Sequence, residues 1–126
     1  MFEEKEAHPI QKPVVFVLSA KDDLKEFPDE ARRTAGVNLD HVQRGLMPEC
    51  AKYLSGLGKG LIELRINEDG DTYRVVYVAR FEEAVYVIDA FKKKSPSGDR
   101  LPKNIKGRIQ SRYQHVKENR PAKVLP

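Results

Sequence analysis

Two groups of cations lie close together along one stretch of this chain, in an arrangement suited to binding phosphate. Lys92, Lys93 and Lys94 are adjacent, at the point where an apolar segment ends. Arg65 and Arg74 lie in the two segments that precede it. Arginine makes bidentate contacts to phosphate oxygens, and a lysine crowded by other cations gives up its proton more readily. These residue types could therefore bind a phosphate group of the kind that nucleic acids carry.

The segments that carry these cations have the patterns of consecutive strands. Residues 62–67 alternate between apolar and polar side chains, which is typical of a half-buried strand. Residues 68–71 are a strong turn signal, and a second strand segment follows at 72–80, with Arg74 and Arg80 on the same face. Residues 84–91 are nearly all apolar, which favours a central strand. We therefore expect the two arginines on adjacent strands and the lysines at the end of the third strand.

The rest of the chain predicts one more strand and three helices. The expected elements are a buried strand at 14–18, a short helix to about residue 26, a helix from 28 to 45, a loop at 47–60 and a last helix at 102–118. The fold class is therefore α+β: an N-terminal strand and two helices, a three-strand antiparallel meander and a C-terminal helix. We expect the helices on one face of the sheet and the opposite face open to a partner.

Length and composition indicate one domain. The expected division is a flexible lead-in at residues 1–12, a domain at 13–118 and a frayed tail at 119–126. No apolar run approaches the roughly 20 residues that span a bilayer, and the charged N-terminus lacks the apolar core of a signal peptide. These features favour a cytoplasmic protein without a membrane contact.

The cysteine and histidine residues do not indicate a metal site. Cys50 is the single cysteine, so no internal disulfide can form. His8, His41 and His115 lie far apart in the sequence, with no acidic or cysteine ligand at useful spacing. We therefore expect neither a metal nor another cofactor.

Charge divides the chain into two parts. Residues 92–126 contain eleven Lys and Arg against two acids, a net charge of +9, whereas residues 1–91 contain twelve against seventeen, a net charge of −5. The two parts account for the overall charge of +4. A basic last third predicts a contact with nucleic acid, and an acidic first part could contact a basic protein.

Three sequence stretches together resemble a known family. They are "LIELRINEDGDTYRVVYVARFEEAVYVIDAFKKKS" from residue 61, "SAKDDLKEFPDEARR" from residue 19 and "LPKNIKGRI" from residue 101. Their order is similar to that of RelE/HigB-type toxins of the RelE/ParE superfamily, specifically the phage-derived HigB-like branch. The resemblance covers about residues 13–118 and implies the RelE-like fold.

The resemblance implies the toxin of a type II toxin–antitoxin system. Such toxins are metal-independent endoribonucleases that cleave mRNA, commonly on the ribosome, and so inhibit translation. A cognate antitoxin, often a helix-turn-helix protein of the HigA-like kind, holds them inactive. The resemblance implies a complex with such an antitoxin, which either contains a toxin homodimer or is a heterotetramer.

The resemblance also implies roles for individual residues. Arg74 matches the arginine of the family's "YR…Y" strand and is the expected transition-state stabiliser, with Lys92 or Lys94 in proton transfer. Some relatives place a histidine or an acid near the cleaved bond, and this sequence has no well-matched equivalent. The expected RNA-binding residues are Arg65, Lys93, Tyr77, Lys103, Lys106 and Arg112.

Simpler interpretations stay open for the same residues. Arg65 and Arg74 could be solvated side chains paired with Glu63 or Asp71, and the lysines could protect a sheet edge from pairing. Tyr77 is of a type found more often in a core than at a catalytic site. The basic last helix could bind RNA, or it could receive an acidic antitoxin segment.

Two rival functions fit the same scaffold. A ParE-like protein would inhibit DNA gyrase by binding and cleave nothing, and fold alone does not separate it from a nuclease. A non-catalytic RNA-binding module is the third possibility, although the sequence is poor in exposed aromatic residues suited to stacking bases.

Overall fold

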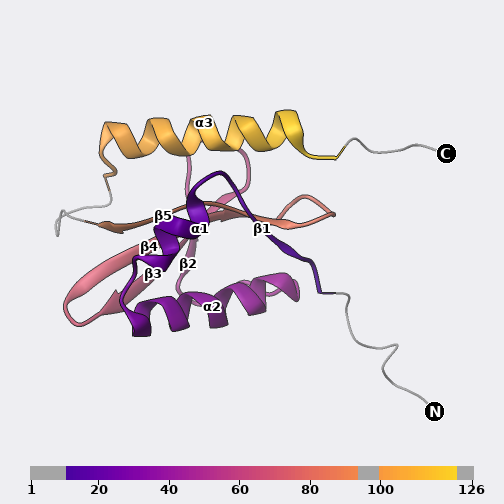
Figure 1. Cartoon of the computed structure of the whole chain (residues 1–126). Helices are drawn as coiled ribbons and strands as arrows, with labels where there is room; N and C mark the ends of the chain where they lie inside the picture. Colours follow the sequence, from indigo (N-terminus) through magenta and orange to yellow (C-terminus); the bar gives the residue numbers. More distant parts are fainter. Residues whose placement is uncertain (1–10, 94–99, 122–126) are drawn as a thin grey trace, which may run out of the picture.

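The computed structural model describes residues 11–93 and 100–121, which form a five-stranded sheet between helices (Figure 1). The strands lie in the order β1-β5-β4-β3-β2, with β1 parallel to β5 and the other neighbours antiparallel. This arrangement confirms the predicted α+β class, including the meander of three antiparallel strands. The elements are β1 Val14–Phe16, α1 Ala20–Lys25, α2 Asp29–Gln43, β2 Ala51–Tyr53, β3 Leu61–Glu68, β4 Asp71–Val78, β5 Val85–Lys93 and α3 Lys103–Asn119.

One face of the sheet packs against α1 and α2. The alternation in β3 turns Ile62, Leu64 and Ile66 to this side, as the sequence predicted. The apolar stripe of α2, at spacings of three and four residues, covers them. The buried residues of that stripe are Ala31, Ala35, Leu39 and Val42.

The opposite face packs against α3, so the prediction that all helices share one face is wrong (Figure 1). Val76 and Val78 of β4 point to this side and are fully buried. A strand that is apolar on both faces needs cover on both. The apolar residues of α3 provide it, namely Ile109, Tyr113 and Val116.

Two details of the strands also differ from the prediction. Residues 51–53, expected to be part of a loop, form β2, which pairs with residues 62–64 of β3. β4 ends at Val78 instead of Arg80. A three-residue edge strand has too little pattern to stand out among glycines, which explains why β2 was missed.

Contacts extend the folded region past the expected domain boundaries. Lys12 bonds through its ammonium group to the carbonyls of Ala79 and Phe81, at 2.6 and 2.9 Å. At the other end, Arg120 donates two hydrogen bonds to Glu83, at 2.7 and 2.8 Å. The expected fraying from residue 119 therefore does not include Arg120.

The turn between β3 and β4 fixes the position of the two arginines. Asp69 and Gly70 have φ values of 53° and 84°, the pair of positive angles that a tight two-residue hairpin turn requires. Asp69 and Gly70 therefore set the register, and in that register Arg65 is directly opposite Arg74.

Candidate nucleic-acid interface

The two arginines converge on one buried carboxylate. Glu63, Arg65 and Arg74 lie on the α3 face of the β3–β4 hairpin. Arg74 Nη1 is 2.8 Å and Arg65 Nε is 3.0 Å from the same Glu63 oxygen, Oε1. Arg74 is 5% exposed and Glu63 is 2% exposed, whereas the side chain of Arg65 is 27% exposed. The pairing with Glu63 agrees with the simpler interpretation of these arginines, but Arg74 is not on a solvated face.

Arg74 has more hydrogen-bonding capacity than its neighbours use. Within residues 11–93 and 100–121, its Nε and Nη1 atoms have no hydrogen-bond partner, because the close approach of Nη1 to Glu63 lacks hydrogen-bond alignment. Glu63 Oε2 is also unpartnered in this part of the chain. An unsatisfied buried polar group costs about 1–3 kcal/mol, so each one in a folded protein calls for a partner such as a water molecule or an ion. These atoms are almost inaccessible to solvent, so an oxyanion would reach them only if the side chains above them moved.

The lysines divide between the two faces of β5. Lys93 is the register partner of Thr72 and lies on the Arg74 face. Lys92 is the partner of Tyr73 and turns to the other face, where its ammonium nitrogen is 3.3 Å from Asp71 Oδ2. Lys94 lies outside the described residues. The expected convergence with Arg65 and Arg74 is therefore found for Lys93 and not for Lys92.

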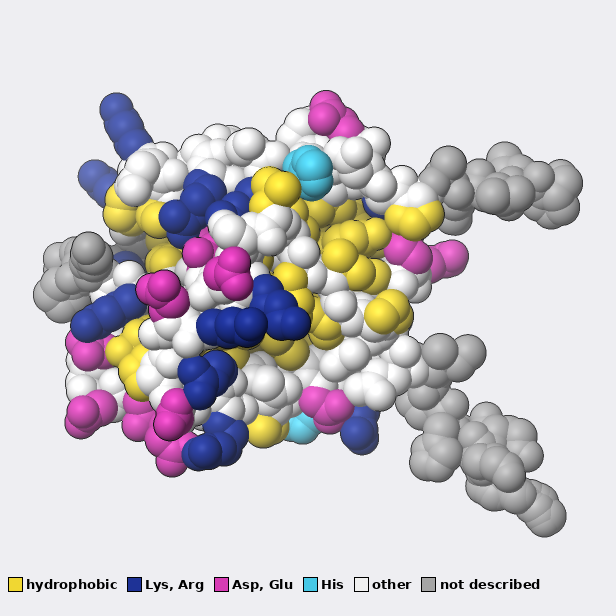
Figure 2. Space-filling model, in the orientation of Figure 1, with side chains coloured by type: hydrophobic (Ala, Val, Ile, Leu, Met, Phe, Trp, Pro, Cys, Tyr) yellow, Lys and Arg dark blue, Asp and Glu magenta, His cyan; other side chains and the backbone are white. Residues whose placement is uncertain are grey.

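A groove of about 340 Å³ lies where β5 ends and α3 begins. This part of the molecule lies at the left in Figure 2, where Lys and Arg side chains are visible both at the left end and across the centre of the face, with acidic side chains among them. The groove is basic at its rim and partly apolar inside. Its lining residues are Phe91, Lys92, Lys93, Arg100, Pro102, Asn104, Ile105 and Arg108.

The remaining predicted site residues differ in accessibility. Tyr77 is 1% exposed in the core beneath α2, and burial raises its pKa well above the ordinary value. Arg112 is also buried, at 7% exposure. Tyr77 is enclosed by the core, and the guanidinium of Arg112 is bound by groups of the protein itself, so neither is available to an RNA in this structure. Lys103 and Lys106 are exposed on α3 but do not line the groove.

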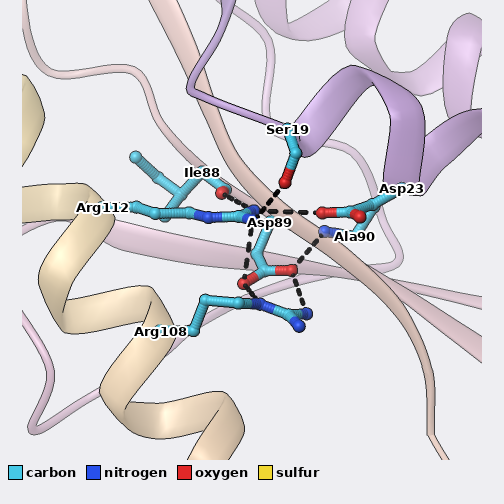
Figure 3. Close-up of polar contacts among 7 residues, drawn as sticks. All are labelled: Ser19, Asp23, Ile88, Asp89, Ala90, Arg108 and Arg112. Carbon is cyan, nitrogen blue, oxygen red and sulfur yellow. Dashed lines mark hydrogen bonds and ion pairs between the residues drawn. The ribbon is translucent and has the colours of Figure 1, made fainter.

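Arg112 belongs instead to a network that attaches α3 to the sheet (Figure 3). Its guanidinium donates to Ser19 Oγ at 2.6 Å, to Asp23 Oδ2 at 3.1 Å and to a backbone carbonyl of β5. Arg108 donates two hydrogen bonds to the fully buried Asp89, at 2.6 and 2.7 Å, which raise the pKa of Arg108 above its ordinary value. One wall of the groove is thereby fixed.

A β-bulge in β5 directs the carboxylate of Asp89 toward α3. The register passes from Val76 opposite Asp89 to Tyr77 opposite Val87, which leaves Ile88 as the extra residue. The consecutive residues Ile88 and Asp89 both contact α3 as a result. The bulge thus combines apolar packing with an ion pair at one position.

Comparison with known proteins gives the family. The family model described as "Phage derived protein Gp49-like" matches residues 22–114, most of the chain. The chain belongs to the Gp49-like family. The resemblance to RelE/HigB-type toxins is confirmed, since Gp49-like proteins are a RelE/HigB-like family.

Solved structures give the fold of this Gp49-like protein. It is similar to a free-state structure of a mutant E. coli toxin RelE, with a TM-score of 0.58 and 16% sequence identity over 84% of this chain and 98% of that one. Identity at this level shows the RelE fold and no more. No curated protein is significantly similar in sequence to the chain. Family and fold together support a toxin of a toxin–antitoxin pair.

Sequence reasoning missed several residues of the Gp49-like site. Asp89 is an acid inside an otherwise apolar strand, and that contrast is the signal that could have identified it. Arg108 is one of several basic residues of α3, and nothing in the spacing of these residues indicates that it binds Asp89. Arg100 precedes that helix and was not distinguished from the other basic residues of the tail.

Two further classes of site were searched in the described ranges, 11–93 and 100–121. No group of three or more His, Cys, Asp or Glu residues there could hold a metal ion. No helix among them has the length and apolar character needed to cross a membrane.

Proposed function

We propose that this Gp49-like protein is the toxin of a type II toxin–antitoxin pair and acts as an mRNA endoribonuclease that inhibits translation in the cytoplasm. The observation that carries the proposal is the Arg65–Glu63–Arg74 cluster, which leaves donors of a buried arginine without partners on the basic face of a RelE-like fold. The family resemblance supports mRNA, bound in the ribosome, as the substrate.

The proposed reaction is transesterification within the RNA. The ribose 2′ oxygen forms a bond to the adjacent phosphorus while the bond from phosphorus to the 5′ oxygen breaks. The 2′-hydroxyl gives up its proton and the departing 5′ oxygen receives one. The products are a 2′,3′-cyclic phosphate and a 5′-hydroxyl end, and DNA, which lacks the 2′-hydroxyl, is not cleaved.

Arg74 and Arg65 act on the charge that develops at the phosphate. A planar guanidinium with spare donors can bond phosphorane oxygens, and its low-exposure setting makes such bonds stronger than they are in water. Glu63 is a positioning residue, because its single oxygen Oε1 contacts both guanidinium groups. It keeps both arginines in place, and among the described residues it leaves Arg74 Nε and Nη1 without a hydrogen-bond partner.

Proton transfer is assigned to the lysines at the end of β5. Lys92 borders the groove, and its ion pair with Asp71 is half-exposed on both sides, so releasing it takes only about 0–1 kcal/mol. Lys94 is the second candidate for this role. Lys93, on the Arg74 face, contributes RNA binding together with the exposed Lys103 and Lys106.

An antitoxin partner completes the proposal. The family resemblance supports a helix-turn-helix antitoxin of the HigA-like kind, in a heterotetramer or with a toxin dimer. A neutralising partner gains most by covering charge that RNA needs, so an acidic segment over the exposed basic residues of α3 is the expected contact.

The test is induced expression in bacteria followed by mapping of RNA 5′ ends that carry a hydroxyl group. We expect discrete cuts in mRNA and growth arrest with the wild-type chain, and neither with Arg65→Ala. Arg65 is preferred over Arg74 for alanine substitution because its side chain is partly exposed, so its loss disturbs the core less. Arg44→Ala, an exposed residue of another ion pair, is the matched control and should cut like the wild type.

The rival functions appear as distinct outcomes of this experiment. Growth arrest with DNA damage and no RNA cuts would indicate a gyrase inhibitor and refute the nuclease. RNA binding without cuts or arrest would indicate a non-catalytic module. Cuts that persist in Arg65→Ala would exclude the arginine cluster from the site.

A further inference from the structure

The groove between β5 and α3 has an aromatic wall that the proposed reaction does not use. Phe91 lies in β5 and is half-buried at the edge of the core under α3. It is the register partner of Arg74, so the ring and the arginine cluster occupy neighbouring positions on one face of the sheet. Pro102 and Ile105 line the same groove from the start of α3. Phe91, Pro102 and Ile105 thus make up the apolar part of the groove, and Phe91 lies on the Arg74 face of the sheet.

We propose that this groove is a nucleobase subsite, in which the base next to the cleaved phosphate stacks on Phe91. The inference rests on the proposed function and adds to it how RNA is held. A volume of about 340 Å³ is at the lower end of ligand pockets, of a size for one base and not for a folded partner. Every base has a π face, so stacking on Phe91 holds RNA without selecting a sequence.

The rim of the groove carries the charge that a nucleotide needs. Lys93, Arg100 and Arg108 are among its lining residues, and Lys92 adds a fourth cation at the strand edge. Arg108 is held by Asp89, but its side chain is still 38% exposed. Cations around a partly apolar interior match a base flanked by phosphates, whereas a purely aliphatic ligand would make no use of the cations.

An acidic protein segment is the competing occupant of the groove, and the presence of Phe91 favours a nucleobase over it. Carboxylates would use the rim cations but gain little from the face of Phe91, which carries partial negative charge. A nucleobase uses both. In the same groove, Asn104 offers an amide that can donate to and accept from a base edge.

The test measures binding of an RNA that cannot be cleaved. The probe is a short oligoadenylate with 2′-O-methyl ribose throughout and one 2-aminopurine, whose fluorescence falls when the base stacks. Phe91→Leu removes the π face and keeps an apolar side chain of similar size, so packing under α3 is retained. Phe91→Tyr keeps the ring. Val15→Ala, at the half-exposed edge strand β1, is the control.

We expect quenching with the wild type and an affinity roughly 5- to 150-fold weaker with Phe91→Leu. Phe91→Tyr and Val15→Ala should bind like the wild type. An unchanged affinity in Phe91→Leu, or an oligonucleotide that does not bind the wild type, would overturn the subsite. Binding of an oligoglutamate peptide in place of the RNA would overturn it in favour of a protein occupant.

The two proposals fail separately. If the uncleavable RNA binds and is quenched but natural mRNA is not cut in cells, the nuclease proposal is wrong and the subsite stands. If mRNA is cut and Phe91→Leu binds like the wild type, the nuclease stands and the base is held elsewhere.

Discussion

The attachment of α3 to the sheet depends on Asp89, and the substitution Asp89→Asn measures how much this residue contributes to the stability of the fold. Asp89 is fully buried and accepts two hydrogen bonds from Arg108, while Arg112 lies 3.6 Å away. Removing one partner of a buried ion pair typically destabilises a protein by about 3–5 kcal/mol when the other charge stays buried and unpaired. Here the side chain of Arg108 is 38% exposed and Arg112 keeps its bond to Asp23, so we expect the lower figure, about 3 kcal/mol.

The expected loss is large enough to measure by melting. Unfolding entropy of about 2.1 cal/mol/K per residue gives about 0.26 kcal/mol/K for 126 residues. A loss of about 3 kcal/mol therefore lowers Tm by about 12 °C. Circular dichroism melts of wild type and Asp89→Asn provide the measurement. Asp40→Asn, in an exposed pair with Arg44, is the control and should change stability by less than about 0.5 kcal/mol.

A double-mutant cycle separates the ion pair from general packing. Arg108→Gln combined with Asp89→Asn should lower stability by clearly less than the two single losses together, because each single change leaves an unpaired charge. If Asp89→Asn melts like Asp40→Asn, or if the two effects simply add, the assigned role of this ion pair is wrong.

Two further predictions concern other parts of the fold. A Cβ at Gly58 would lie 2.4 Å from the Tyr113 ring, so Gly58→Ala should lower the free energy of unfolding by about 1–3 kcal/mol in urea. Gly36 of α2 has open space around it, so Gly36→Ala should raise the free energy of unfolding by up to about 1 kcal/mol. Equal effects of the two substitutions would contradict the packing. Hydrogen bonds from Arg120 hold the pKa of Glu83 at about 2, below its usual value of 4.5. A carboxyl group with a lowered pKa stabilises the fold at pH values above its usual pKa, and this stabilisation is lost as the pH falls toward about 2. The stability difference between wild type and Glu83→Gln should therefore be constant above about pH 5 and shrink between pH 4.5 and about 2. A difference that does not depend on pH would contradict this account.

Patterned segments could be predicted from the sequence, and paired charges could not. The alternation around Ile62, Leu64 and Ile66 identified β3 and its faces, because one buried face imposes a period of two. The residues 51–53 of β2 are too few to show a period. Val76 and Val78 are buried on the second face of β4, where α3 covers them opposite the other helices. Apolar residues on both faces of this strand could have predicted that arrangement.

The candidate site was predicted in part for the same reason. Alternation put Arg65 and Arg74 on one face, and the register confirmed it. The same period of two puts Lys92 and Lys93 on opposite faces of β5, so only Lys93 shares the face of Arg65 and Arg74. The basic helix gave no sign that Arg112 is buried, because its partners come from distant segments of the chain.

The most direct test of the central claim is the single-turnover rate at which ribosome-bound mRNA is cut by wild type and Arg74→Lys. Lysine keeps the positive charge beside Glu63 but lacks the planar donors proposed to bond the phosphorane oxygens. Rates are compared at a temperature where circular dichroism shows both proteins folded, with Arg44→Lys as the control. The account predicts a rate roughly 100- to 1000-fold lower for Arg74→Lys and an unchanged rate for the control. Equal rates for wild type and Arg74→Lys, or no cleavage by the wild type, would contradict it.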